Sequence, residues 1–171
     1  KPEKKLKKIH SLRHQITAYF IGLLFLSILT ITVINGAFLE KYYVTKKIDV
    51  LLDLRTTLEN TDIDKMMNSD SFEGSESIPD EIQRACSRNN LSWVIIDSSN
   101  TSWLSWGENE KMLQSKLFGY VYDLDEDGDK SRTLKQGDNY TIQQSHDRFA
   151  GMDYVECWGQ FDNGYYFLIR S

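Results

Sequence analysis

The chain has 171 residues, of which 26% are charged, and a formal net charge of −5 at pH 7. This charge is divided unevenly, because residues 1–14 carry a net +5 and residues 40–171 carry a net −10. Two prolines and ten glycines exclude a collagen-like array and argue against a disordered tail. A net charge of −10 also argues against nucleic-acid binding by the larger segment.

Residues 16–39 form the longest apolar run, ITAYFIGLLFLSILTITVINGAFL, with no charged residue among 24. A helix of this length extends roughly 36 Å, which is enough to cross a hydrocarbon core of about 30 Å. The run is therefore predicted to be a transmembrane helix rather than the core helix of a soluble protein. A secretory signal peptide is the other alternative, but its apolar region is shorter, about 7–15 residues, and Asn35-Gly36-Ala37 is a poor cleavage site.

The flanking charges predict the orientation of this helix. Residues 1–15 form a basic arm, and positively charged flanks stay on the cytoplasmic side. We therefore expect the arm to lie in the cytoplasm against anionic lipid, and residues 40–171 to be extracellular. The predicted location of the chain is the plasma membrane.

The helix is expected to continue beyond Glu40, because apolar residues recur there at helical spacing. Val44, Ile48, Leu51 and Leu58 follow intervals of three and four residues, with a charged Arg55 in the same stripe. One interpretation is that the stripe packs on its own domain. Another is that it pairs with a second copy of the chain to form a homodimer, and both interpretations can hold together.

The remaining 130 or so residues suffice for one domain with its own core. Asn163-Gly164 between two apolar runs is a strong hairpin signal. Helices followed by antiparallel strands predict an α+β fold, with helices packed on an antiparallel sheet. The expected elements are a short helix capped by Thr61 or Asp62 and reaching Met67, helices over 80–89 and 109–122, and strands over 91–97, 101–106, 140–145, 152–161 and 165–170.

The two cysteines, Cys86 and Cys157, lie in the segment predicted to be extracellular. An even count in an exported domain allows one disulfide, and the alternative is two buried free thiols. Their separation and the lack of a nearby His or Cys argue against zinc.

Residues 123–129 match the first half of a calcium-binding loop, D-x-D-x-D-G, with carboxylates on Asp123, Asp125, Asp127 and Asp129. Leu134 occupies the twelfth position, where such loops place a bidentate Glu. The alternatives are a solvated acidic loop and a weak calcium or magnesium site. No other cofactor is expected.

No catalytic residues are identified in this chain. His146 next to Asp147 does not make a catalytic triad, and there is neither a phosphoacceptor His box nor a Gly-rich ATP-binding motif.

The order of several short phrases resembles the membrane-sensor region of bacterial two-component histidine kinases, those of clostridia above all. The phrases are the basic start, the apolar run ending FLEKYY, SWVIID in residues 92–97, and W-x-x-x-D-N-G-Y-Y-F-L-I-R in residues 158–170. The resemblance implies an extracellular PAS-like domain (PDC or single Cache) at residues 40–171, between two membrane helices of which the second lies beyond Ser171. Signals would then pass through dimeric membrane helices to a cytoplasmic kinase and its response regulator.

The resemblance also suggests where a ligand would bind. Trp103, Trp106 and Tyr122 lie where a PAS-like fold opens, so they are the candidate lining of a small-ligand pocket, and the alternative is that they belong to the core. The expected signal is a small molecule, a peptide or a cation. The rival functions are the sensor of a chemoreceptor or cyclase, and a single-pass anchored binding or structural protein.

Overall fold

The computed structural model describes residues 12–67, 78–99, 101–107, 109–124, 131–147 and 150–171. The chain divides into two compact units, residues 1–43 and 44–171. Helix α1 (Leu12–Glu59) contributes to both units, and all strands belong to the second unit. The predicted α+β class is confirmed.

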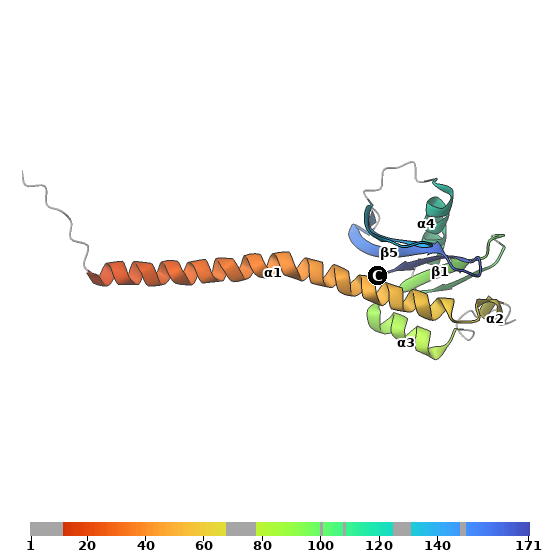
Figure 1. Cartoon of the computed structure of the whole chain (residues 1–171), viewed down its shortest axis with the longest axis horizontal. Coiled ribbons are helices and arrows are strands. Elements are labelled where there is room, and N and C mark those ends of the chain that lie inside the picture. Colours follow the sequence, from red (N-terminus) through yellow and green to blue (C-terminus); the bar gives the residue numbers. More distant parts are fainter. Residues whose placement is uncertain (1–11, 68–77, 100, 108, 125–130, 148–149) are drawn as a thin grey trace, which may run out of the picture. The chain divides into compact units, whose positions relative to one another are not determined.

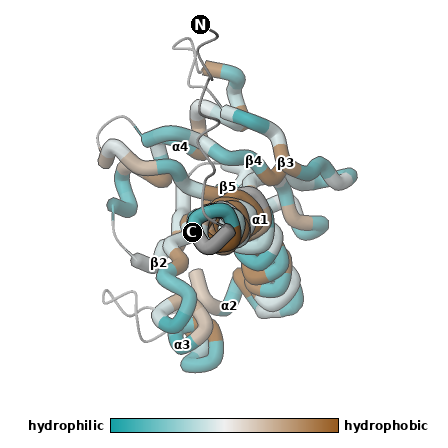
Figure 2. Tube along the Cα trace, turned by 90° about the vertical axis from the view of Figure 1, so that its left-hand side faces the viewer, coloured by the Kyte–Doolittle hydropathy of each residue, from teal (hydrophilic) through white to brown (hydrophobic). Residues whose placement is uncertain are grey.

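Within the described residues, α1 is the one helix that is long and apolar enough to span a membrane. Its large apolar side chains from Ile16 to Leu39 are exposed, unlike those of a buried core helix. Figure 2 shows the hydrophobic residues of α1 in brown. Ser27, Thr30 and Thr32 donate their hydroxyl hydrogens to carbonyl oxygens four residues earlier, so these polar groups are satisfied within the helix. Helix α1 is therefore consistent with a membrane span, and the orientation of this span in the membrane stays a prediction.

The second unit is built on one antiparallel sheet of six strands in the order β2-β1-β6-β5-β4-β3. This order is consistent with a PAS-like arrangement. The strands are β1 (Ser92–Ile96), β2 (Trp103–Trp106), β3 (Arg132–Gln136), β4 (Tyr140–Asp147), β5 (Met152–Gln160) and β6 (Tyr166–Arg170).

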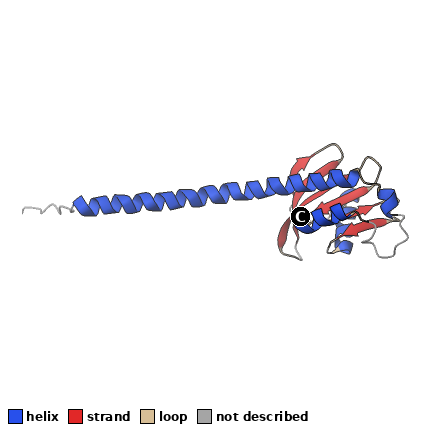
Figure 3. Cartoon of the chain, turned by 90° about the horizontal axis from the view of Figure 1, so that it is seen from below, coloured by secondary structure: helices blue, strands red, loops and turns tan. Residues whose placement is uncertain are grey.

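Helices cover both faces of the sheet, which Figures 1 and 3 show from two directions. The second half of α1 and helix α3 (Asp80–Asn89) lie on one face, where Trp93, Ile95 and Ile169 contribute to the larger core cluster. Helix α4 (Glu110–Tyr122) lies on the other face and packs its Leu113 and Leu117 on a smaller cluster. Helix α2 (Ile63–Met67) follows α1 and is capped by Asp62, which accepts a hydrogen bond from the backbone N–H of Lys65.

The apolar stripe of α1 packs on its own domain. Leu51 and Leu58 are fully buried, and Ile48 packs at the edge of the same cluster. Arg55 fits into this stripe because its guanidinium lies 5.0 Å from the centre of the Tyr140 ring and donates to Asn139 at 3.1 Å. The first interpretation of the stripe is thus confirmed for Leu51 and Leu58, and the homodimer stays a prediction.

The sequence predicted every strand except β3. The sequence of β3 shows no alternation between apolar and polar residues, and four of its five residues are exposed. Its pairing with β4 is also irregular between Thr133 and Lys135. Edge strands bury only part of one face, so they carry a weak hydrophobic signal. The hairpin at Asn163-Gly164 is confirmed, and Gly164 has the positive φ of 90° that favours glycine.

Candidate functional site

A group of charged and polar side chains is buried beneath α4, on the face of the sheet that this helix covers. Glu156 on β5 is fully buried, and Arg170 on β6 lies directly opposite it in the strand register, at 6% exposure. Glu156 lies between the buried residues Val155 and Cys157, and Arg170 follows the buried Ile169. We call the whole group the α4 network; it comprises Lys116 and Tyr120 of α4, Ser145 and Asp147 of β4, Glu156 of β5 and Arg170 of β6.

Glu156 is the centre of the α4 network because three side chains donate to its carboxylate. Arg170 donates from Nε to Oε1 at 2.7 Å, and Lys116 Nζ lies 3.1 Å from the same oxygen. Tyr120 donates its hydroxyl hydrogen to Oε2 at 2.6 Å. Burial and the adjacent Glu156 charge both raise the pKa of Tyr120, so its hydroxyl stays protonated as the donor.

Two further bonds extend the α4 network across the sheet. Arg170 donates from Nη1 to Asp147 at 3.1 Å and lies 4.3 Å from the centre of the Tyr154 ring. Lys116 donates to Ser145 at 2.8 Å. Two cations therefore neutralise two anions in a place where an unpaired charge would be very unfavourable.

The α4 network connects to α1 through the last residue of the chain. Ser171 follows Arg170 and exchanges two backbone hydrogen bonds with Val155 of β5. The carbonyl oxygen of Ser171 also accepts a hydrogen bond from Lys47 Nζ of α1, at 3.2 Å. Arg170 is therefore connected to α1 through one neighbouring residue, Ser171.

A cavity of about 200 Å³ lies next to Arg170, at the end of the sheet where β1 begins and β2 ends. Trp106, one of the three predicted ligand residues, lines this cavity together with Tyr154 and Arg170. Trp106, predicted to bind a ligand, and Arg170 of the α4 network therefore line the same cavity.

The other two predicted ligand residues lie elsewhere. Trp103 pairs with Ile96 on β1, is 51% exposed, and donates from its indole nitrogen to Glu110 at 2.7 Å. Tyr122 ends α4, stacks on Phe118, and lines a space of only about 10 Å³. The structure does not bring the three residues together, so Trp103 and Tyr122 make no common pocket with Trp106.

The acidic loop lies largely outside the described residues. Asp123 is described: it ends α4 in a left-handed conformation, with its backbone N–H bonded to the Gly119 carbonyl. Asp125, Asp127 and Asp129 lie outside the described residues. Among the residues that the structure does describe, no three acidic, His or Cys side chains gather in a way that would hold a metal ion.

Cys86 and Cys157 are free buried thiols, so the disulfide allowed by their even number is not formed here. Cys86 on α3 neighbours Trp93 of β1, whereas Cys157 is on β5, with β6 between those two strands. Burial raises the pKa of Cys86 to about 11 and that of Cys157 to about 12.

The sequence reasoning missed the α4 network, although a signal was present. Glu156 and Arg170 are charged residues at inward-facing positions of predicted strands, and such residues are rarely buried unless they are paired. The partners Lys116 and Tyr120 are four residues apart on α4 and so lie on one side of the helix.

Comparison of the chain with family models, curated proteins and solved structures found no match.

Proposed function

We propose that this chain is the signal-sensing region of a membrane histidine kinase. In this proposal α1 crosses the plasma membrane with its N-terminus in the cytoplasm, and residues 40–171 form an extracellular PAS-like domain of the PDC or single Cache type. The kinase and a second membrane helix would follow Ser171, and a response regulator would receive the phosphoryl group.

The observation that carries the proposal is the link between the α4 network and α1. A sensor needs a site that a signal can alter and an element that transmits the change toward the membrane. Arg170 belongs to the buried network, and the next residue bonds to Lys47 on the helix that leads to the apolar segment.

The proposed mechanism is a change between two arrangements of the α4 network. In one arrangement Lys116 and Tyr120 hold α4 on Glu156, as in the structure. In the other, a signal that competes for Arg170 or Glu156 loosens α4 and moves the end of β6. A ligand shifts such an equilibrium only by its difference in affinity for the two arrangements. Buried ion pairs suit this role because their net stabilisation is small and their geometry is specific.

The coding sequence after Ser171 tests this proposal. A second apolar run of about 20 residues, followed by a helix with a phosphoacceptor His and an ATP-binding domain, supports it. The same run followed by a chemoreceptor or cyclase module would keep the sensor and replace the kinase. A stop codon directly after Ser171 would overturn the signalling account and leave an anchored binding protein.

A further inference from the structure

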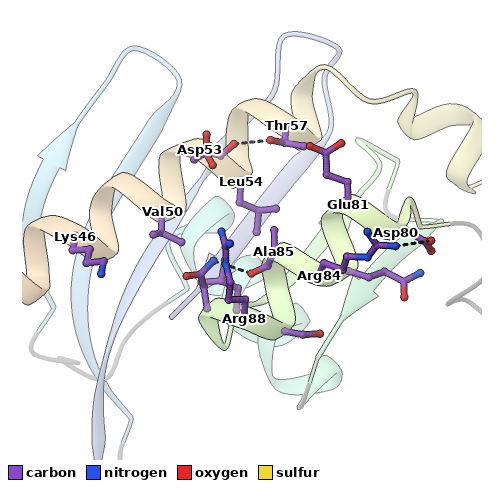
Figure 4. Close-up of a pocket in the computed structure, with 14 residues that line it drawn as sticks. Lys46, Val50, Asp53, Leu54, Thr57, Asp80, Glu81, Arg84, Ala85 and Arg88 are labelled. Carbon is purple, nitrogen blue, oxygen red and sulfur yellow. Dashed lines mark hydrogen bonds and ion pairs between the residues drawn. The ribbon is translucent and has the colours of Figure 1, made fainter.

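The cavity next to Arg170 differs in charge from the larger groove between α1 and α3. The groove has a volume of about 1570 Å³, and Figure 4 shows acidic and basic side chains of both helices along it. In the cavity of about 200 Å³, Arg170 is the one charged side chain among the lining residues that the structure describes. Of the expected signals, a cation therefore fits this cavity poorly, whereas a small anion fits it well.

Hydroxyl and amide side chains supply much of the remaining lining of the cavity. They belong to Ser87, Asn90, Ser92 and Asn109, and each of them can donate and accept hydrogen bonds. The side chains of Asn90 and Asn109 make no hydrogen bond to any other part of the chain that the structure describes. Both amides can therefore serve a ligand.

The backbone is left-handed at three points of the cavity lining, with φ of 52° at Asn90, 98° at Gly107 and 61° at Asn109. A left-handed residue commonly ends a helix, as Asn90 does after α3. Asn109 is unusual, because an N-cap normally has β-region angles and bonds its side chain to the first turn of the helix. Asn109 has neither feature. Unfavourable backbone conformations of this kind gather at ligand sites, which supports a binding role for Asn109.

The guanidinium of Arg170 has donors that the α4 network does not use. Of its five N–H groups, one on Nε bonds to Glu156 and one on Nη1 bonds to Asp147. Nη2 lies 2.7 Å from the Glu156 carboxylate but makes no hydrogen bond to the described part of the chain. Nη2 is also buried, so a ligand reaches it by displacing Glu156 from Arg170. A carboxylate can do so, because it binds a guanidinium through two parallel hydrogen bonds.

We propose that the cavity binds a small monocarboxylate, with its carboxylate on Arg170 and its other polar groups on Asn90 and Asn109. The ring of Trp106 then lies beside the ligand. A water molecule occupies about 30 Å³ in the liquid, so the cavity has the volume of roughly seven waters and suits an acid of only a few carbon atoms. The role of this acid as the signal rests on the proposed function, whereas its binding does not.

Isothermal titration calorimetry of the full chain in detergent micelles tests the binding. The probes are acetate, glycolate and N-acetylglycine, each compared with its neutral amide, which has a similar shape. We expect at least one acid to bind with a millimolar or lower Kd, and about tenfold more tightly than its amide. No heat of binding from any acid up to about 10 mM, or equal affinities of acid and amide, would overturn the proposal.

Substitution by glycine tests the two amide side chains. Asn90→Gly and Asn109→Gly remove the amides at backbone positions that favour glycine, so each should weaken binding roughly fivefold. Asp123→Gly is the matched control, because Asp123 is the other left-handed non-glycine residue that the structure describes and it lies at the opposite end of α4 from Asn109. It should leave the affinity unchanged. A control that weakens binding as much as the Asn variants would contradict the site.

A conservative substitution tests the contact with Arg170. Arg170→Lys keeps the positive charge and loses the fork of donors that matches a carboxylate, so binding should weaken about tenfold. Circular dichroism and thermal melting establish that each variant is folded, and the two Asn variants carry the test if Arg170→Lys is not. An unchanged affinity in folded Arg170→Lys would overturn the contact.

Calorimetry needs no kinase activity, so the site and the proposed function can fail separately. An acid that binds and also changes the autophosphorylation rate of the complete protein supports both. An acid that binds without changing this rate keeps the site and overturns its role as the signal.

Discussion

Tyr120 donates a hydrogen bond of 2.6 Å to Glu156, and this bond attaches α4 to the centre of the sheet. The Tyr120 ring also stacks on Trp158 at 5.1 Å between ring centres. One side chain thus joins the buried carboxylate to the smaller apolar cluster. The stability of the domain should depend on it.

The change Tyr120→Phe keeps the ring and removes the hydroxyl. We expect a loss of about 1.5–3 kcal/mol in unfolding free energy, because a hydrogen bond to a buried charge is removed. Urea unfolding of the full chain in detergent, followed by tryptophan fluorescence, measures it. Tyr122→Phe is the control, since Tyr122 is 55% exposed, and it should leave the midpoint unchanged. Equal effects of the two changes would contradict the assignment.

Arg170 neutralises two buried carboxylates at once. Arg170→Met should therefore destabilise the domain by about 3–5 kcal/mol, because the buried carboxylates of Glu156 and Asp147 lose a shared cation. Adding Glu156→Gln to this variant should recover part of the loss. A double-mutant cycle of thermal unfolding in detergent measures the coupling, and strictly additive effects would refute the paired network.

The sequence predicted elements with strong periodicity and missed features that depend on distant partners. The stripe of α1, the helix after Pro79 and the Asn163-Gly164 hairpin follow from local spacing and turn chemistry. Strand β3 is an exposed edge, so its residues show little alternation. The elements that the sequence predicted correctly are those determined by the spacing and turn chemistry of neighbouring residues.

The α4 network was not predictable in the same way, because its members come from α4, β4, β5 and β6. Only the strand order β6-β5-β4 brings Arg170, Glu156 and Asp147 together. The separation of Trp103 from Trp106, by contrast, follows from local alternation, because residues three apart on one strand face opposite sides of the sheet.

The free thiols of Cys86 and Cys157 can be titrated with a thiol reagent. Both should react with a disulfide reagent such as Ellman's after unfolding without reductant, giving two thiols per chain. In the folded chain at pH 8 the reaction should be slow, because both side chains are fully buried and their pKa values are raised. Recovery of fewer than two thiols from freshly purified protein would show that a bridge forms.

Asp97 should make stability depend on pH. Its carboxylate accepts hydrogen bonds from Ser99, Thr101 and Ser102, which lower its pKa to about 2 from an ordinary 3.8. The unfolded chain binds the proton more readily, so this contribution is complete above about pH 4 and is lost as the pH falls toward 2. Asp97→Asn should lower the melting temperature at pH 7, with the gap to the unsubstituted chain closing as the pH approaches 2. A gap that does not change with pH would contradict this role.

Autophosphorylation of the complete protein in membrane vesicles, measured with radiolabelled ATP, tests the sensor account most directly. The account predicts a labelled histidine, and a labelling rate that Glu156→Gln changes severalfold although the substitution lies in the sensor domain. Asp153→Asn, on the same strand but pairing only with exposed groups such as His146, should leave the rate unchanged. Absence of a labelled histidine, or equal rates for both folded variants and the unsubstituted protein, would contradict it.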